Sequence, residues 1–442
     1  MHPGSYEMKW NSFSSGERWI AWTTVLLIAS MATLVQSYVT FKLYFLSLFL
    51  LVFLVNFALR KIRIVVYRRL VWFYLWIGMA GVAWALVGVF HPGNYVQGDL
   101  EALRLYVVWS AAFVVLYTLL RAGPSLRILH TAMVLAGILI PLVNFVGLYD
   151  QFSGLGLISE GVQQELGMQI GFGDGFIQIT SHNIDVMFLI APYLLSLQFR
   201  ADARKSHSKL TKLALVLSLL LVVVSGRRAL WIVVALTPCT ILLLSRLTGG
   251  YGLMKTGGKR FLLTCAAASV AGLSVLLIIP EGALDIGSIN RLKQAFSAED
   301  ERTIQMPYLI HAFLKSPVLG SGFGGYAGYQ RSELRPWTYE LTYLKLLFNT
   351  GIVGTALLLT LFSHYFLLVI RLLRQFKDGS TVPFGLLIAY CSFLVGAYSN
   401  PYFGSFDLLY FVGWLPFLST FQWGFDQPKS SAGGALCSSN AS

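Results

Sequence analysis

Long apolar runs separated by short polar segments make up most of the 442-residue chain. A helix needs about 20 mostly apolar residues to cross the hydrocarbon core of a bilayer, and twelve runs approach that length. They predict spans at 19–38, 43–59, 70–90, 105–120, 128–148, 183–199, 210–225, 229–245, 261–280, 342–370, 382–399 and 406–424. The pattern therefore predicts an all-α, polytopic integral membrane protein of about 12 transmembrane helices.

Composition agrees with this class. Hydrophobic residues make up 56% of the chain and charged residues 12%, with a mean hydropathy of +0.67, which excludes an ordinary soluble protein. The net charge of +13 does not indicate nucleic-acid binding, because the basic residues sit in short clusters between apolar runs. Three of the four cysteines fall inside such runs and the fourth in the tail, so neither a disulfide framework nor a zinc site is predicted.

The basic clusters also predict the orientation in the membrane. Alternate loops are rich in Lys and Arg and nearly free of acids: 60–69, 121–127, 200–209, 246–260 and 371–377. The positive-inside rule makes these loops cytoplasmic, and both termini with them. The predicted organisation is a cytoplasmic N-terminus at 1–18, a single transmembrane domain at 19–425 and a disordered cytoplasmic tail at 426–442. The loops 91–104, 149–182 and 281–341 are then external.

Two of the external loops are long. The loop 149–182 contains Gly171-Phe172-Gly173-Asp174-Gly175-Phe176, and its glycines predict turns in an ordered segment on the membrane surface. The loop 281–341 gathers cations, acids, aromatic residues and glycines before the chain re-enters an apolar helix. Polar residues concentrated in this way in a membrane protein indicate a place where substrate is held or chemistry is done.

Two arginines interrupt the apolar pattern in Ser225-Gly226-Arg227-Arg228-Ala229-Leu230-Trp231. The predicted topology puts them at the external face, where the positive-inside rule does not expect them. One interpretation is a tight helical hairpin whose arginines extend to lipid headgroups. The other is a guanidinium site for a phosphate-bearing substrate, because arginine makes planar, bidentate contacts with phosphate oxygens.

The loop 281–341 holds further candidates in its second half. Arg302 precedes His311 by nine residues; the histidine is either a general base or a structural polar residue. The acids at 299–301 either bind a divalent metal or are simply solvated, and the chain has no Asp-x-Asp motif. The glycines at 320, 322, 324 and 325 suggest close backbone approach at a substrate cleft, because the lysine and preceding strand of a phosphate-binding P-loop are missing.

Glu340 is the most informative acid, because it stands at the entry of the apolar helix in Tyr339-Glu340-Leu341-Thr342. A glutamate in a first helical turn can simply complement the helix dipole. Alternatively, it is a carboxylate held at the membrane surface facing the arginines, which suits a general base for a hydroxyl nucleophile.

At these residues the chain resembles the O-antigen ligase and O-antigen polymerase superfamily of bacterial envelope glycan enzymes. The resemblance rests on Ser225–Trp231, on Arg302 followed by Pro317-Val318-Leu319-Gly320-Ser321-Gly322, and on the Tyr-Leu-x-Leu-Leu-x-x-x-Gly-x-x-Gly pattern from Tyr343 to Gly354. It covers roughly 225–365. The ligases have His-Asn where this chain has Glu340-Leu341, and the glutamate version is similar to the polymerase-type members.

The resemblance implies a metal-independent, inverting glycosyltransferase of the bacterial inner membrane. Such an enzyme polymerises undecaprenyl-diphosphate-linked repeat units into O-antigen or exopolysaccharide at the periplasmic face. The expected partners are the lipid-linked glycan, membrane lipid, a flippase and a chain-length regulator; no metal, cofactor or nucleic acid is expected. The expected catalytic residues are Glu340 as base, His311 as second choice, and Arg228. The expected substrate-binding residues are Arg227, Arg228, Arg302, Tyr339 and Tyr343.

Two other functions stay open. An O-antigen ligase, which transfers finished glycan to the lipid A-core of lipopolysaccharide, performs the same chemistry with another acceptor. A flippase or other transporter of lipid-linked oligosaccharide belongs to a different class and is expected to carry charges deep within its spans. Here most charges lie at the edges of the apolar runs, and no internal repeat is evident, which weighs against a transporter.

Overall fold

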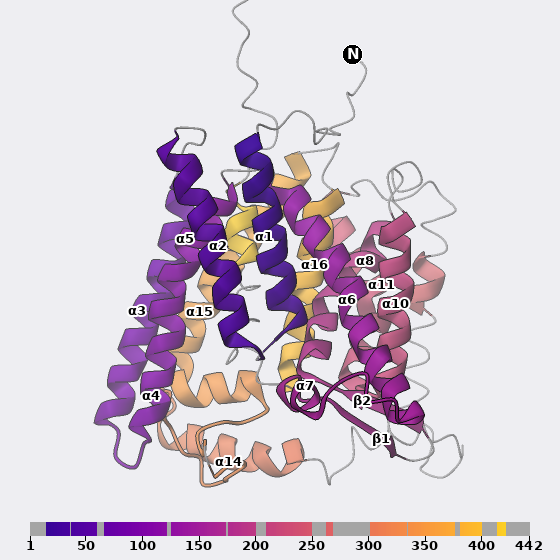
Figure 1. Ribbon diagram of the computed structural model, residues 1–442. Helices are drawn as coiled ribbons and strands as arrows, with labels where there is room; N and C mark the ends of the chain where they lie inside the picture. Colours follow the sequence, from indigo (N-terminus) through magenta and orange to yellow (C-terminus); the bar gives the residue numbers. More distant parts are fainter. Residues whose placement is uncertain are drawn as a thin grey trace, which may run out of the picture.

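The computed structural model (Figure 1) describes residues 15–35, 37–59, 66–121, 125–173, 176–199, 209–249, 262–267, 301–333, 335–375, 381–399 and 413–420. The predicted tail at 426–442 and the predicted metal candidates at 299–300 lie outside these residues. Within them the chain is mostly helical, as an apolar membrane chain must be, because a helix satisfies every backbone polar group internally.

The elements follow one another along the chain as a series of helices with one β-hairpin. They are α1 (Ser15–Thr33), α2 (Val39–Ala58), α3 (Arg68–Phe90), α4 (Val96–Leu103), the π-helix η2 (Arg104–Val108), α5 (Trp109–Arg121), α6 (Ser125–Ser153), α7 (Glu160–Glu165), β1 (Gln169–Gly173), β2 (Phe176–Thr180), the 3-10 helix η3 (His182–Val186), α8 (Met187–Gln198), α10 (Lys209–Val224), α11 (Arg228–Leu247), α14 (Glu301–Lys315), α15 (Thr342–Gln375), α16 (Thr381–Gly396), the 3-10 helix η4 (Ala397–Ser399) and α18 (Trp414–Leu418).

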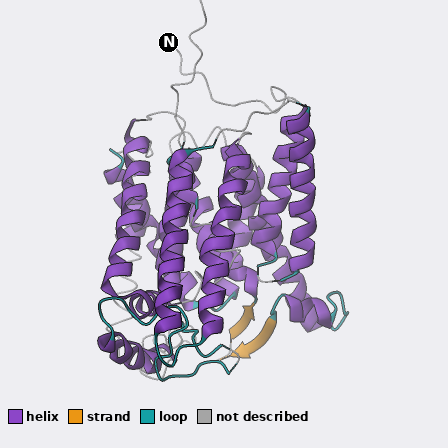
Figure 2. Cartoon of the chain, turned by 90° about the vertical axis from the view of Figure 1, so that its left-hand side faces the viewer, coloured by secondary structure: helices purple, strands orange, loops and turns teal. Residues whose placement is uncertain are grey.

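The long helices pack side by side as a bundle, and several short elements lie at one end of it (Figures 1 and 2). That end, opposite the beginning of α1, carries α7, α14 and the β-hairpin. Among the described residues, six helices are long and apolar enough to cross a membrane: Thr40–Ala58, Arg68–Phe90, Val96–Thr118, Leu126–Ser153, Arg228–Leu247 and Thr342–Gln375. The all-α membrane class is thereby supported.

The apolar runs locate the helices closely. The runs at 43–59, 70–90, 128–148, 229–245 and 342–370 fall on α2, α3, α6, α11 and α15. The runs at 261–280 and 406–424 lie largely outside the described residues. The total of twelve spans therefore stays a prediction.

The core has a large part inside the bundle and a small part under α14. The main part surrounds α8, whose residues from Met187 to Leu194 are all buried, as expected for a helix that is apolar on every side. The small part consists of Leu309, Ala327, Tyr339, Leu341 and Phe348. It seats α14 and the following loop on the beginning of α15, so burial of apolar surface fixes the loop where the chain re-enters the membrane.

One of the predicted external loops is shorter than the sequence predicts. The stretch 91–104 was expected to be a loop, but α4 begins at Val96 and continues through η2 into α5. Its polar residues suggested a loop because they break the apolar pattern. Asp99 is instead buried inside the fold, where its carboxylate accepts the backbone N–H of Gly324 at 2.9 Å. A contact distant in sequence therefore allows the helix to carry an acid.

The other unexpected element is the β1–β2 hairpin within the loop 149–182. The strands pair antiparallel, with Gln169 opposite Thr180 and Gly173 opposite Phe176. Only Asp174 and Gly175 separate the strands in sequence, and Asp-Gly is a dipeptide typical of two-residue hairpin connections. The glycines of this loop predicted turns on the membrane surface. The Asp-Gly dipeptide between two segments of alternating residues is the pattern that predicts a hairpin.

A break in α15 receives the glycine-rich segment 317–325, here called the glycine loop. Gly351 lies inside α15 with φ 61° and ψ −170°, a conformation that is essentially restricted to glycine. The backbone groups on either side of the break bond to the glycine loop: Ser321 N to Phe348 O at 3.1 Å, Gly322 N to Asn349 O at 2.9 Å, Ile352 N to Pro317 O at 2.9 Å, and Val353 N to Val318 O at 3.1 Å. The glycine loop thus lies close against the backbone of α15 and is fixed there by backbone bonds; its predicted flexibility and close approach at a substrate cleft stay a prediction.

Gly351→Ala is expected to lower the free energy of unfolding by about 2 kcal/mol or more, since a side chain is strained at this φ. Its Cβ would also lie 2.3 Å from the carbonyl oxygen of Val318. Gly161→Ala is the matched control, because its Cβ would meet nothing within 4 Å and alanine favours a helix. Thermal unfolding of the purified protein in detergent measures both. Equal melting temperatures for the two variants would contradict this view of the break.

Candidate functional site

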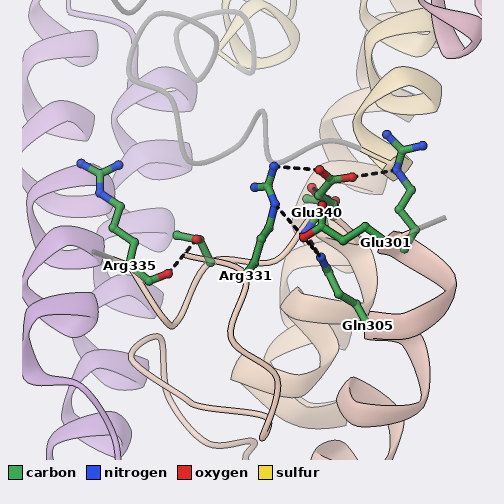
Figure 3. Close-up of polar contacts among 8 residues, drawn as sticks. Glu301, Gln305, Arg331, Arg335 and Glu340 are labelled. Atoms are coloured by element: carbon green, nitrogen blue, oxygen red, sulfur yellow. Dashed lines mark hydrogen bonds and ion pairs between the residues drawn. The ribbon is translucent and has the colours of Figure 1, made fainter. Parts of the chain in front are cut away.

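The Glu340 carboxylate lies between two arginines at the end of the bundle that carries α14. Arg302 Nε is 2.9 Å from one carboxylate oxygen, and Arg331 Nη2 is 2.7 Å from the other. Figure 3 shows Glu340 with Arg331 reaching it from the loop before α15. The Glu340 side chain is 14% exposed, while the two arginine side chains are 31% and 33% exposed. The carboxylate is therefore mostly enclosed by guanidinium groups that still reach solvent.

A second layer of polar groups fixes this arrangement. Gln305 is fully buried; its amide oxygen accepts the backbone N–H of Glu340 at 3.0 Å, and its amide nitrogen donates to Glu301 at 3.2 Å. Glu301 also lies 3.3 Å from Arg331 Nε. Two arginines and two glutamates balance in charge, and Gln305 joins α14 to the turn that carries Glu340. These residues, with Arg302, are here called the Glu340 cluster.

Tyr329 extends the cluster along the loop. Its phenol is hydrogen-bonded to Glu301. Burial in the first place, and then the negative charge of Glu301, raise the pKa of Tyr329. The phenol therefore stays protonated at neutral pH and acts as a hydrogen-bond donor to the carboxylate.

A second charged cluster surrounds Arg227 in the turn between α10 and α11. Its guanidinium forms an ion pair with Asp185 and donates to the carbonyl oxygen of Ser181 at 3.2 Å. Both partners follow β2 directly, so the end of the predicted external loop 149–182 and the beginning of η3 reach the arginine turn. Burial, and then the charge of Arg227, lower the pKa of His182. The side chain of Arg227 is 24% exposed and is paired with a carboxylate, which differs from a side chain simply extended toward lipid headgroups.

Arg228 is the first residue of α11 and is partly buried. A cation at this position is unfavourable by itself, because the N-terminus of a helix already carries partial positive charge. The positive end of α11 and two adjacent arginines form a region that suits an anion.

The predicted site residues do not all lie together in the structure. It joins Arg302 to Glu340 and gives Arg227 a carboxylate of its own in Asp185, both at the same end of the bundle. The convergence of all the predicted arginines with Glu340 on one cleft stays a prediction. His311 lies on α14, but nine residues turn an α-helix by about 180° beyond whole turns. It therefore lies on the side of α14 away from Arg302, and its side chain is exposed.

The two predicted substrate-binding tyrosines also differ. Tyr339 is completely buried and its phenol oxygen accepts the backbone N–H of Ala327 at 2.7 Å. Burial raises the pKa of Tyr339 to about 12. This side chain packs and has no surface for a ligand. Tyr343 is 37% exposed at the start of α15 and donates to the carbonyl oxygen of Leu394 at 2.5 Å, so its role in substrate binding stays a prediction.

Sequence reasoning missed Arg331, Gln305 and Asp185. Arg331 had a usable signal, because it is an arginine that the predicted topology puts at the external face, like those at 227 and 228. Gln305 and Asp185 carry no such signal, since their importance comes only from distant partners. The described residues contain no group of three His, Cys, Asp or Glu side chains able to hold a metal. Metal independence stays a prediction.

Comparison with known proteins identifies one family. The profile of the O-antigen ligases matches residues 213–359, about a third of the chain, which includes α11, α14, the glycine loop and the first half of α15. No curated protein matches the chain. The match confirms the predicted resemblance to the O-antigen ligase and polymerase superfamily, and it covers both charged clusters except Asp185 and its neighbours.

Proposed function

We propose, from the O-antigen ligase match over residues 213–359, that this membrane protein is a glycosyltransferase that polymerises undecaprenyl-diphosphate-linked repeat units. The observation that carries the proposal is the enclosed Glu340 carboxylate between Arg302 and Arg331. The site would lie at the periplasmic face of the bacterial inner membrane, with both termini in the cytoplasm, because the loops between the opposite helix ends are basic.

The arrangement suits transfer of a sugar from a diphosphate. A carboxylate has about four lone-pair sites, and the two ion pairs leave capacity to accept a hydrogen bond from the acceptor hydroxyl. Glu340 takes the hydroxyl proton while the hydroxyl oxygen bonds to the anomeric carbon. The bond from that carbon to the diphosphate breaks on the opposite face, which inverts the anomeric configuration. The lipid diphosphate leaves with the electron pair.

The leaving diphosphate needs neutralisation more than it needs a proton. Arg302 approaches Glu340 directly, so it can stabilise negative charge that develops next to the reacting bond. Arg227 and Arg228 at the positive end of α11 suit the other phosphate oxygens. Asp185 balances the charge of Arg227 when no substrate is bound. We propose that the reaction needs no metal, so EDTA should leave elongation unchanged.

A ligase is the second candidate, and the description of the matching family favours it. The glutamate at position 340 favours the polymerase, because the ligases resemble one another in His-Asn at this point. The glycan profile of a deletion strain separates the two functions. Loss of a polymerase leaves single repeat units on the acceptor, whereas loss of a ligase leaves none and accumulates lipid-linked polymer.

Arg228→Lys is expected to lower the rate of chain elongation by about 10-fold or more although the charge is kept. An ammonium group cannot make the planar, bidentate contact with phosphate that a guanidinium makes. Arg246→Lys, at the opposite end of α11 and exposed, is the matched control and should elongate normally. Elongation of lipid-linked repeat units by purified protein measures both. Normal elongation by the Arg228 variant would return this residue to a role at lipid headgroups.

A further inference from the structure

A pocket of about 270 Å³ opens at the C-terminal end of α14. Its lining combines the connection between α3 and α4, the end of α14, the segment after the glycine loop and the first part of α15, including His91, Asn94, Lys315, Ser316, Tyr326 and Phe348. The volume approaches the range of small-molecule sites. We call it the α14 pocket. None of the residues that form the Glu340 cluster lines it.

One face of α14 connects the pocket with the Glu340 cluster. Glu301, Gln305, Tyr308, Ala312 and Lys315 follow one another at intervals of four, three, four and three residues, which places them on one face of a helix. The first two belong to the cluster and the last two line the pocket. The distance along the helix is about 20 Å at 1.5 Å per residue.

The segment 326–331 runs antiparallel along the same face. Arg331 meets Glu301 at 3.3 Å, and the rings of Tyr329 and Tyr308 lie 5.6 Å apart. Tyr326 lines the pocket together with Lys315. The pocket and the Glu340 carboxylate are therefore the two ends of one wall made by a helix face and an extended segment. A linear substrate that lies along this wall reaches both.

The chemistry of the pocket fits a sugar ring. Tyr326 is 40% exposed, and its ring is perpendicular to that of Tyr95, with centroids 5.9 Å apart. An aromatic face of this kind suits the apolar C–H face of a pyranose. Lys315 and Ser316 supply hydrogen-bond donors suited to ring hydroxyls, and the lining residues include no carboxylate.

The walls of the pocket are held in place before any ligand arrives. Asn94 donates to the carbonyl oxygens of Gly88, at 3.2 Å, and of Ser321. The backbone N–H of Tyr95 donates to Gly324 at 2.9 Å. A pocket built on such bonds loses little conformational entropy when it binds.

We infer that the α14 pocket is a subsite for a sugar of the lipid-linked glycan, several units away from the bond that reacts at Glu340. The inference rests on the proposed function, because that function supplies a glycan anchored at the charged clusters. The sugar belongs either to the donor chain or to the acceptor repeat unit. A sugar from either source would make the same contacts in the pocket. A substrate that is long enough to reach both the pocket and Glu340 then binds more tightly than a shorter one.

Two variants test the subsite, each with a matched control. Tyr326→Ala removes the aromatic face and Lys315→Gln removes the cation. Tyr149→Ala and Lys209→Gln change exposed residues outside the pocket lining. The substrates are the lipid-diphosphate-linked repeat unit isolated from the producing strain and a truncated lipid diphosphate bearing a single sugar. Single-turnover reactions with labelled polymer as donor and unlabelled repeat unit as acceptor show which half-saturation concentration changes.

Both pocket variants are expected to raise the half-saturation concentration of one of the two full-length substrates, the donor polymer or the acceptor repeat unit, by about 10-fold, equal to about 1.4 kcal/mol. Turnover of the truncated substrate should stay unchanged. The controls should match the wild type. Equal losses on both substrates would mean that the residues only support the fold and would overturn the subsite. Normal saturation by the full-length substrate would overturn it as well.

A binding measurement separates this inference from the proposed function. The diphosphate-free oligosaccharide, released from the isolated lipid by mild acid, is the probe in saturation-transfer NMR. Binding to the wild type and loss of binding in Tyr326→Ala support the subsite even if no elongation occurs with any substrate. Elongation by the wild type without binding of the probe, or equal binding by both proteins, supports the transferase and refutes the subsite.

Discussion

Glu340→Gln is expected to depress turnover by about 100-fold or more, the usual scale of general-base catalysis, while the protein keeps its fold and still binds lipid diphosphate. Glutamine preserves the shape of the side chain and can still accept a hydrogen bond, but it cannot take the proton of the acceptor hydroxyl. The backbone N–H of residue 340 remains bonded to Gln305, so the turn itself should not move. The measurement is elongation from purified lipid-linked repeat units with EDTA present.

His311→Gln is the comparison for this prediction. The histidine is exposed on the other side of α14 from Arg302, so its replacement should leave turnover near the wild-type value. Glu340→Asp provides a second comparison, because it keeps the carboxylate and moves it back by one methylene group. Partial activity in the aspartate variant distinguishes a chemical role from a structural one. Normal elongation by Glu340→Gln together with an inactive His311→Gln would show that the histidine is the base.

Arg331→Lys is expected to lower turnover by about 10- to 100-fold, because catalysis is sensitive to small displacements of a reacting group. Arg331 uses two different nitrogens, Nε toward Glu301 at 3.3 Å and Nη2 toward Glu340 at 2.7 Å. A lysine has one compact ammonium group and cannot occupy both positions in this fork geometry. We therefore expect Arg331 to act as a positioning residue that holds the Glu340 carboxylate relative to α14.

Arg335→Lys is the matched control on the same loop. Arg335 is 59% exposed and reaches Glu101 at 3.6 Å, away from Glu340 (Figure 3). An exposed ion pair of this kind contributes little, so this variant should elongate like the wild type. The half-saturation concentration for the lipid-linked substrate is measured alongside turnover. A positioning role requires the loss in the Arg331 variant to appear mainly in turnover; a loss confined to half-saturation would make Arg331 a substrate ligand instead.

The sequence predicted well what depends on local composition. The apolar runs located the helices because burial in lipid demands about 20 apolar residues for each crossing. Arg302 and Glu340 stood out because each is a charge in an unexpected place. The match over residues 213–359 then supported the superfamily that these motifs had suggested.

The parts that failed depend on contacts between distant segments. Residues 96–103 form a helix because Gly324 satisfies Asp99 from more than two hundred residues away. Arg331 selects Glu340 only when the loop folds back along α14, and no local pattern encodes that path. Tyr339 lies buried in the small core, a position that its place beside Glu340 in the sequence did not predict. Burial and pairing of this kind are properties of the tertiary structure.

The loop between Ala327 and Tyr339 begins and ends on a fixed frame. The phenol of Tyr339 accepts the backbone N–H of Ala327 at 2.7 Å, and just before it Gly322 is bonded to Asn349 at 2.9 Å. A surface loop whose two ends are held together tolerates substitution and insertion between them. The exposed residues of this loop can therefore vary around the contacts of Arg331, while Trp337, which is buried with its ring 5.7 Å from that of Tyr95, keeps the loop attached to the start of α4.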